Sequence, residues 1–225
     1  MAKNSTIENF TVVVTNKQTN GRGQQTNTWV SEPNKNLTMS VFIDGLDLEI
    51  NHQKYLNFTI SLAIFDLLST KQIPKLTIKW PNDIMSANKK LCGILIENNS
   101  RKQKIHSSII GIGLNVNQKK FPESLKNAAS LKMLTNKEFN LENLLEELII
   151  YIKKRVTLLS EKKYNQLENE YLDVLYKKNV PTMFKDSNDV LFMGKIIGIS
   201  SSGNLQIELD DESIKEFGIK TISIA

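Results

Sequence analysis

The stretch KWPNDIMSANKKLCGILIE, residues 79–97, determines how the middle of the chain is organised. It follows a short strand predicted over Leu76–Trp80, turns at Pro81-Asn82-Asp83 and continues as a second predicted strand over Leu91–Glu97. Asp83 and Lys90 are seven positions apart across a turn. A hairpin here would let the carboxylate of Asp83 orient the ammonium of Lys90 or hold a metal ion.

Further strands are predicted on both sides of this stretch. Downstream, Ser107–Val116 is typical of a buried strand. Upstream, Phe10–Thr15 is a β-branched run, and Asn36–Ile43 alternates well enough to form another strand. The polar segment Asn16–Asn27 has almost nothing to bury, so it is predicted to be a loop.

Two helical regions complete the first three quarters of the chain. The spacing predicts a helix over Gln53–Ser69, whose apolar face would hold Leu56, Ile60, Ala63, Ile64, Leu67 and Leu68. Asn140 is a suitable cap for a long helix with the apolar face Leu141, Leu144, Leu145, Leu148, Ile152 and Val156. This helix is predicted to continue, with a break, through Tyr176.

After Lys177 the pattern changes to short strands separated by polar turns. The predicted strands are Val180–Phe184, Val190–Ile199, Leu205–Leu209 and Ser213–Ile219. This tail is typical of a small β-barrel with a boundary near Lys177–Asn179. The chain therefore divides into residues 1–177 and residues 178–225.

Composition favours an ordinary globular protein. Hydrophobic residues make up 40% of the 225 residues, charged residues 24%, and the formal net charge is +5. That charge suits nucleotides, nucleic acid or acidic proteins, although a lysine-rich background also produces it. The single cysteine, Cys92, excludes an internal disulfide and fits a reducing compartment. Met1–Thr6 shows no apolar signal region, and nothing resembles a membrane span, so we expect a soluble cytoplasmic protein.

Ligand-binding chemistry is indicated at three places. Arg22 stands between two glycines in a polar loop that ends at Trp29, so backbone and guanidinium could both approach an anion. Lys90 could offer its ammonium to a carboxylate or phosphate. The segment Gly111–Asn117 (GIGLNVN) leaves room for a ring, with an amide to bind its edge. Two of these places have plainer interpretations. The first could be a flexible polar loop with Trp29 as a core residue, and a surface lysine is the plainer interpretation of Lys89 and one of two for Lys90.

In this order the motifs resemble the biotin–protein ligase family. The resemblance runs from about Phe10 to Asn117 and rests on GRGQQTNTW (21–29), KWPND (79–83), KLCGILIE (90–97) and GIGLNVN (111–117). It implies an α+β fold, with a mixed sheet flanked by helices as in class II aminoacyl-tRNA synthetases, and a small C-terminal SH3-like barrel.

The resemblance also implies an activity. Members activate biotin with ATP and Mg²⁺ to biotinyl-5'-AMP, then transfer it to a lysine of a biotin carboxyl carrier protein or carboxylase domain. No chain precedes the catalytic region here to hold the DNA-binding domain of some members, so DNA binding is not expected. Monomer and homodimer both remain open.

Residue roles follow from the resemblance alone. Arg22, with the amides of Gly21 and Gly23, would hold the biotin carboxylate and the α-phosphate of ATP, and Gln18 would line the biotin pocket. Lys90 would bridge carboxylate and phosphate, with Asp83 positioning it or a magnesium ion. The remaining implied contacts are Gly93 and Ile94 to biotin, and Trp29 and Asn115 to adenine.

Three departures from the family pattern stand out. Gln24 replaces a second arginine, and Thr26 replaces a second glycine, which should stiffen the loop. The family's upstream Ser-Thr-Asn segment, part of the biotin pocket, is missing, since Asn4-Ser5-Thr6 lies too near the loop. Two other functions therefore stay open: a ligase for lipoate or another acyl acid, and a non-catalytic basic nucleotide- or RNA-binding module.

Overall fold

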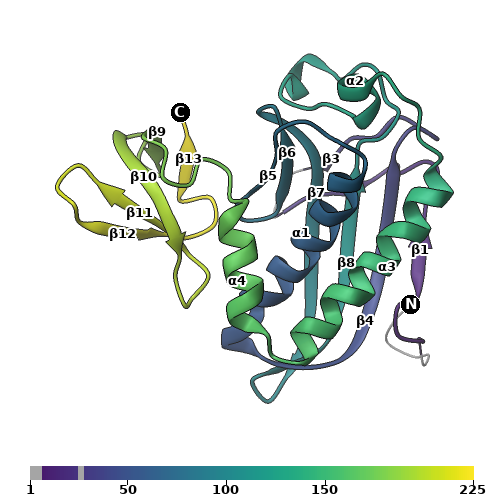
Figure 1. Ribbon diagram of the computed structural model, residues 1–225, viewed down its shortest axis with the longest axis horizontal. Coiled ribbons are helices and arrows are strands. Elements are labelled where there is room, and N and C mark those ends of the chain that lie inside the picture. The colour runs from purple at the N-terminus through teal and green to yellow at the C-terminus, as the bar shows by residue number, and fades with distance from the viewer. Residues whose placement is uncertain (1–6, 25–27) are drawn as a thin grey trace.

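The computed structural model describes residues 7–24 and 28–225 (Figure 1). Its main body contains a six-stranded sheet in the order β1-β4-β8-β7-β6-β5. The strands are β1 (Val12–Val14), β4 (Leu37–Glu49), β5 (Leu76–Lys79), β6 (Asp83–Ser86), β7 (Lys89–Arg101) and β8 (Lys104–Leu114). Asn4-Ser5-Thr6 and Thr26, which the sequence singled out, lie outside the described residues.

All the ladders of this sheet are antiparallel. The α+β class with a large sheet and helices is confirmed, but the implied mixed sheet has parallel pairing only as isolated bridges, such as Ile78 with Leu175. Two expectations change in detail. The turn after Pro81 is itself followed by strand β6, and the strand predicted to end at Ile43 continues to Glu49 past an irregularity after Asp44.

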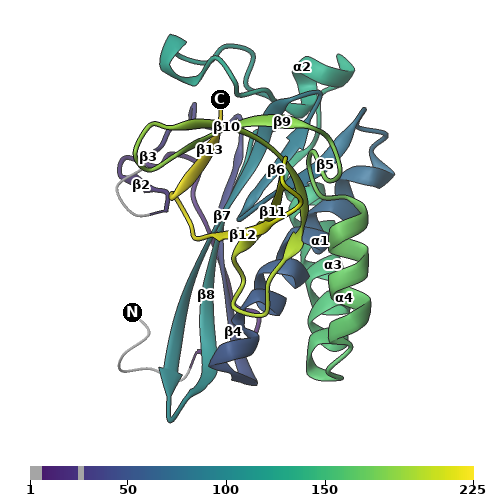
Figure 2. The ribbon, with the colours of Figure 1, turned by 90° about the vertical axis from the view of Figure 1, so that its left-hand side faces the viewer.

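Three helices cover one face of the sheet: α1 (Gln53–Thr70), α3 (Leu141–Ser160) and α4 (Tyr164–Asp173) (Figure 2). The predicted long helix therefore breaks between Ser160 and Tyr164, and Asn140 caps it by accepting a hydrogen bond from the Asn143 amide at 3.0 Å. A short helix, α2 (Leu131–Thr135), and the 3₁₀ turns Ile50–His52 and Glu123–Leu125 were not predicted, because they are too short to show periodicity.

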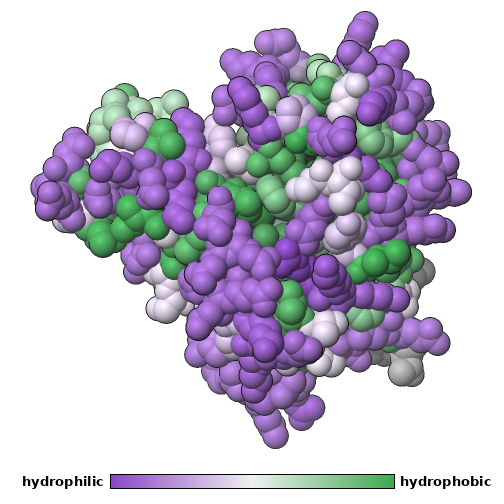
Figure 3. Space-filling view, in the orientation of Figure 1, coloured by the Kyte–Doolittle hydropathy of each residue, from purple (hydrophilic) through white to green (hydrophobic). Residues whose placement is uncertain are grey.

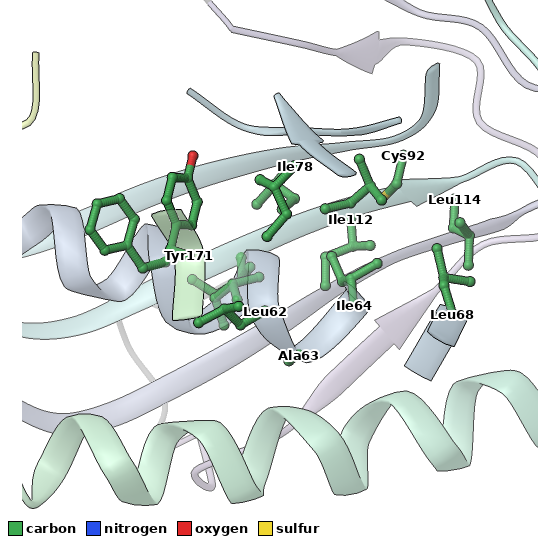
Figure 4. Packing of buried hydrophobic residues seen from close by; sticks show 14 of the residues in the cluster. Leu62, Ala63, Ile64, Leu68, Ile78, Cys92, Ile112, Leu114 and Tyr171 are labelled. Carbon is green, nitrogen blue, oxygen red and sulfur yellow. The ribbon is translucent and has the colours of Figure 1, made fainter. Parts of the chain in front are cut away.

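Helix α1 is the centre of the core. Its predicted apolar face is buried, but so are Phe58, Thr59, Ser61 and Leu62 on the other sides, because α1 lies between the sheet and the helices α3 and α4. Figure 4 shows Ile64 and Leu68 of α1 beside Ile112 and Leu114 of β8. The helices thus occupy one face of the sheet and leave the opposite face for other uses.

The C-terminal region forms a second, five-stranded antiparallel sheet in the order β12-β11-β10-β9-β13. Its strands are β9 (Thr182–Asp186), β10 (Leu191–Ile199), β11 (Leu205–Leu209), β12 (Ile214–Phe217) and β13 (Ile222–Ile224). Strand β13 was not predicted. The end strands β12 and β13 do not pair within the described residues, so the expected barrel is open here rather than closed. The domain boundary near Lys177–Asn179 stays a prediction.

A buried ion cluster ties the three helices together. Arg155 of α3 donates two hydrogen bonds to Asp66 of α1, at 2.7 and 2.9 Å, and a further one to Glu170 of α4. Its side chain is only 11% exposed, against 35% for Glu170. Burial raises the pKa of Glu170, but hydrogen bonds from Gln166 and Arg155 outweigh burial and leave this pKa below its usual value.

We expect Arg155→Ala to lower the free energy of unfolding by about 3 kcal/mol, the low end of the range for broken buried pairs, because Glu170 is partly solvated. Because the pKa of Glu170 is lower in the folded protein, this carboxylate stabilises the fold fully above its ordinary pKa of 4.5. That stabilisation is lost as the pH falls through the pKa of the folded state. In urea titrations, the difference in free energy of unfolding between wild type and Arg155→Ala should therefore become smaller below the folded-state pKa of Glu170. Lys185→Ala, which breaks an exposed pair with Asp189, should have little effect. An equally small effect of Arg155→Ala would contradict the stabilising role given to the Arg155 cluster.

Among the described residues, no helix is both long and apolar enough to cross a membrane. On the helix side, the surface is mostly hydrophilic, with hydrophobic residues gathered near the junction with the C-terminal sheet (Figure 3).

Candidate active site

The sheet face opposite the helices is lined with small residues. Across neighbouring strands, Thr38 pairs with Gly113, Gly113 with Gly93, and Gly93 with Asp83. The alternating residues Met39, Ile112 and Ile94 are buried and belong to the core. Because successive side chains of a strand point to opposite faces, this alternation leaves a shallow trough on the face away from the helices.

Lys90 reaches this trough because of an irregularity in the β6–β7 hairpin. Lys90 and Gly93 are three residues apart, so in a regular strand their side chains would point to opposite faces. The register shifts between Ile84 and Met85, which pair with Cys92 and Lys90, and leaves Leu91 as an extra residue on β7. Such a bulge re-aims side chains, and the Lys90 ammonium consequently lies 3.3 Å from where a Cβ on Gly93 would stand.

The predicted approach of Asp83 to Lys90 is present. Lys90 Nζ lies 2.6 Å from Asp83 Oδ1, and the two side chains are 36% and 22% exposed. The neighbouring Asn82 donates from Nδ2 to the Ile94 carbonyl at 2.5 Å and accepts from the Ile94 amide at 3.0 Å through its own carbonyl. Asn82 thus anchors the turn to β7 and holds Asp83 in place beside the ammonium.

A cavity of about 530 Å³ covers this trough. Of the ten residues that the resemblance assigns to the site, eight line it: Gln18, Arg22, Gly23, Trp29, Asp83, Lys90, Gly93 and Ile94. Gly21 pairs with Trp29 in a neighbouring hairpin, and Asn115 lies outside the lining, 3% exposed. The sequence motifs therefore converge on one cavity from four separate segments.

Trp29 occupies the trough itself. The segment predicted as a loop, Asn16–Asn27, contains strand β2 (Gly21–Arg22), which pairs with β3 (Thr28–Trp29) just beyond it. The two strands lie over the open face (Figure 2). The indole is so close to Gly113 that a Cβ there would stand 2.4 Å from Trp29 Cε2. Its ring centroid also lies 5.8 Å from Lys90 Nζ, and its own N–H is buried with no hydrogen-bond partner among the described residues.

Arg22 stands at the rim of the cavity, in a bidentate pair with Glu97 of β7. The two nitrogen–oxygen distances are 3.1 and 3.0 Å, and the side chains are 72% and 46% exposed. An exposed pair is worth little and is easily exchanged. The guanidinium can therefore leave Glu97 for an anionic group in the cavity at small cost.

The two asparagines of GIGLNVN have different surroundings. Asn117 donates to the Phe139 carbonyl at 2.8 Å and accepts from the Phe139 amide at 3.0 Å, which makes it a structural link to the segment before α3. Asn115 is equally buried, but its Oδ1 has no hydrogen-bond partner in residues 7–24 and 28–225. A buried amide oxygen without a partner is costly, so Asn115 retains the capacity to accept a further hydrogen bond.

Sequence reasoning missed several residues of the cavity. The cavity is also lined by Thr38 and Ser40 of β4, by Leu125 of the 3₁₀ turn, and by Gln24 and Glu97. Glu97 in addition forms the ion pair with Arg22. Gln24 and Glu97 belonged to recognised motifs, but neither was assigned to the site. The β4 residues could have been found from alternation, because they occupy the positions between core residues.

Cys92 lies behind this site and takes no part in it. Burial raises the pKa of its thiol, the nearby Lys90 opposes this shift, and the net pKa lies well above its usual value. The side chain is fully buried in the core cluster. Since the thiolate is the nucleophilic form, this cysteine is chemically inert.

Comparisons with known proteins point to ligases. The sequence profile described as "Biotin/lipoate A/B protein ligase family" matches residues 2–115. The bifunctional ligase/repressor BirA of Bacillus spizizenii is 30% identical over 220 residues, which cover 96% of this chain and 66% of that protein. The solved biotin protein ligase of Aquifex aeolicus in complex with biotin and ATP is similar with a TM-score of 0.81 and 26% identity, over 99% of this chain and 91% of that one.

The chain belongs to the biotin/lipoate A/B protein ligase family. It spans 66% of the length of the Bacillus relative, so activity, substrates and partners are taken up as proposals below.

Proposed function

We propose that this chain activates biotin with ATP to biotinyl-5'-AMP and transfers the biotinyl group to a lysine of a biotin carboxyl carrier protein. The observation that carries the proposal is the Lys90 ammonium, held by Asp83 at 2.6 Å on the floor of the cavity. The similarity to a biotin protein ligase solved with biotin and ATP supports the choice of substrates.

The first step brings two anions together. A carboxylate oxygen must attack the α-phosphorus of ATP, the bond from that phosphorus to the oxygen bridging to the β-phosphate breaks, and pyrophosphate leaves. The mutual repulsion of the two anions has to be offset by positive charge. Lys90 would lie between them, and Arg22 would turn from Glu97 toward the carboxylate or the phosphate. Asp83 and Asn82 act before the reaction, because they fix where the ammonium stands. Charge that is already in place before the reaction stabilises the transition state without reorganisation.

The second step is aminolysis. A lysine amine attacks the acyl carbon of the adenylate, the bond from that carbon to the phosphate oxygen breaks, and AMP leaves as the amine loses a proton. No covalent enzyme intermediate is required. This scheme is consistent with the buried, inert Cys92.

A magnesium ion would accompany ATP in this scheme. In the described residues no group of three or more His, Cys, Asp or Glu side chains could hold a metal. Mg²⁺ commonly uses one or two carboxylates together with substrate phosphates, so Asp83 alone could contribute a ligand. Its observed partner is Lys90, which favours the positioning role that the resemblance gave as one alternative.

The proposal includes a setting as well as a reaction. The partner would be the carrier protein or domain of a biotin-dependent carboxylase, and the location would be the cytoplasm. The free thiol of Cys92 supports a reducing compartment.

The test is acyl-adenylate formation from ATP and Mg²⁺, with biotin, lipoate and octanoate as parallel acids and mass spectrometry of the products. We expect biotinyl-AMP, and little product from the other two acids. Product from lipoate alone would favour the sibling activity of the same family. No product from any acid would contradict the proposal and favour the non-catalytic alternative.

A further inference from the structure

A cluster of polar side chains lies where the chain enters β4 and leaves β8. It consists of Asn36, Gln118 and Ser130 (the polar cluster), all of which are buried. Asn36 is tied to the sheet, because its Oδ1 accepts from the Val116 amide at 3.0 Å. None of the three residues lines the cavity at Lys90. Since buried polar groups are nearly always hydrogen-bonded, their partners show what the cluster holds in place.

Gln118 is the centre of this cluster. Its Oε1 accepts from Asn36 Nδ2 at 2.6 Å and from the Glu32 amide at 3.1 Å. Its Nε2 donates to the Lys120 carbonyl at 2.8 Å, and its backbone carbonyl accepts from Ser130 Oγ at 2.6 Å. Both ends of the amide are therefore occupied, and the bonds join the chain before β4 to the chain after β8.

The segment after Trp29 is the first part of the cavity wall that the cluster holds. Trp29 and Val30 line the cavity, and the next two residues are bonded to the cluster. The Ser31 hydroxyl accepts from Asn36 Nδ2 at 3.1 Å, and the Glu32 amide donates to the cluster at 3.1 Å. Because so little chain lies between, the polar cluster limits where the Trp29 ring can stand in the trough.

The loop of residues 119–129 is the second part of the wall. Ser124 and Leu125 within it line the cavity. The two ends of the loop are joined, because the Ser130 hydroxyl donates to the Gln118 carbonyl at 2.6 Å. A loop whose ends are held together has less conformational freedom to lose when a ligand binds against it. The cluster thus presents this part of the wall already formed.

The same loop returns along β7 at Lys90. The Lys90 amide donates to the Asn127 carbonyl at 2.7 Å, and the Lys90 carbonyl accepts from the Ala129 amide at 3.0 Å. The loop therefore stands at a fixed place beside the strand that carries the ammonium. As a result, the polar cluster and β7 together fix where this wall stands relative to the ammonium.

The hydrogen bonds of Gln118 make the two parts of the wall depend on each other. Loss of its amide would remove the acceptor that two donors share, Asn36 Nδ2 and the Glu32 amide. A buried donor left without its acceptor costs more than the bond itself contributed. Both donors can regain a partner if their segments move outward into water. Because groups in one network support one another, the two parts of the wall should loosen together.

We propose that Gln118 is a positioning residue for adenylation, which holds the segment after Trp29 and the loop 119–129 together as two walls of the Lys90 cavity. The inference rests on the proposed function, because it gives the polar cluster a part in binding biotin and ATP. Gln118 itself does not line the cavity and acts through the two segments. Its contribution is therefore to the affinity for the substrates rather than to the chemical step.

Three variants test this role. Gln118→Met keeps most of the size of the side chain and removes the amide. Asn117→Leu is the matched control, since Asn117 is also buried and makes two hydrogen bonds, but to Phe139, which does not line the cavity. Ser130→Ala is a milder variant, because it removes only the hydroxyl that bonds the Gln118 carbonyl and caps α2.

Hydrogen–deuterium exchange of the free proteins measures how firmly the walls are held, without relying on activity. In Gln118→Met we expect faster exchange than in wild type in residues 28–35 and 119–129, and unchanged exchange in α3. In Ser130→Ala only residues 119–129 and α2 should exchange faster. Asn117→Leu should exchange faster around Phe139 and leave both wall segments as in wild type.

Exchange of labelled pyrophosphate into ATP measures the effect on the site. Gln118→Met should raise KM for biotin and for ATP at least about tenfold, a factor that corresponds to about 1.4 kcal/mol. Its kcat should change by less than about threefold, because the pair of Asp83 with Lys90 lies outside the cluster. Asn117→Leu should keep both KM values within about twofold of wild type.

Three results would overturn the inference: unchanged deuterium exchange of the wall segments in Gln118→Met, an equal acceleration throughout the protein, or a rise in KM in Asn117→Leu as large as in Gln118→Met. A fall in kcat with both KM values unchanged would likewise contradict it. If the wild-type chain shows no biotin-dependent pyrophosphate exchange, the proposed function fails, whereas deuterium exchange still decides whether the cluster holds the two segments.

Discussion

Lys90→Ala is expected to reduce the rate of biotinyl-AMP formation by about a hundred- to a thousandfold, the range seen when one preorganised charge-stabilising group is removed from an active site. The reason is geometric. The bulge in β7 brings Lys90 to the cavity floor, and Asp83 holds its ammonium at 2.6 Å. Single-turnover measurements with saturating ATP and biotin would read the rate of the chemical step directly.

The neighbouring lysine provides a matched control. Lys89 precedes Lys90 on β7, but its ammonium donates to the Lys126 carbonyl at 2.7 Å and does not line the cavity. Lys89→Ala should therefore adenylate biotin at nearly the wild-type rate. Thermal unfolding of both variants shows whether each remains folded. A Lys90→Ala protein that is folded and within a few-fold of wild type would refute the role given to this lysine.

Gly113→Ala should be the second most damaging change. An added Cβ would stand 2.4 Å from Trp29 Cε2 and 2.7 Å from the indole nitrogen, so the ring has to leave the trough. Overpacking of this kind costs about 1–3 kcal/mol, which corresponds to roughly 5- to 150-fold in substrate affinity. We expect the loss mainly in KM for biotin and ATP, measured by steady-state adenylation.

Gly111 is the matched position for this prediction. It lies two residues earlier on β8, and an added Cβ there would meet the Leu95 carbonyl oxygen at 3.5 Å, an ordinary contact. Gly111→Ala should change KM much less than Gly113→Ala. Equal effects of the two substitutions would mean that the position of Trp29 over the trough is not what matters.

The core of the fold could be read from the sequence wherever periodicity was strong. The helices at Gln53 and Asn140 and the strands that contain the GIL and GIG motifs were found because their apolar spacing is regular. Strand β6 was not found, since its four residues follow directly on the Pro81 turn. The hairpin over Gly21–Trp29 was missed because its four paired residues bury little, so composition predicts a loop.

The candidate site could be predicted only in part, because its geometry depends on a bulge and on long-range contacts. The ion pair of Asp83 with Lys90 followed from a turn between them, but the bulge that aims Lys90 toward Gly93 has no sequence signature. The Arg22–Glu97 pair joins residues 75 positions apart and could not be foreseen from spacing. The hydrogen bond between Asn36 and Gln118 spans 82 positions and could not be foreseen either.

The most direct test of the central claim is the exchange of labelled pyrophosphate into ATP by this chain with Mg²⁺, with and without biotin. Reversible adenylation in the Lys90 cavity predicts exchange that depends on biotin and is lost in Lys90→Ala but kept in Lys89→Ala. Exchange that is equally fast without biotin, or that persists in Lys90→Ala, would contradict the account.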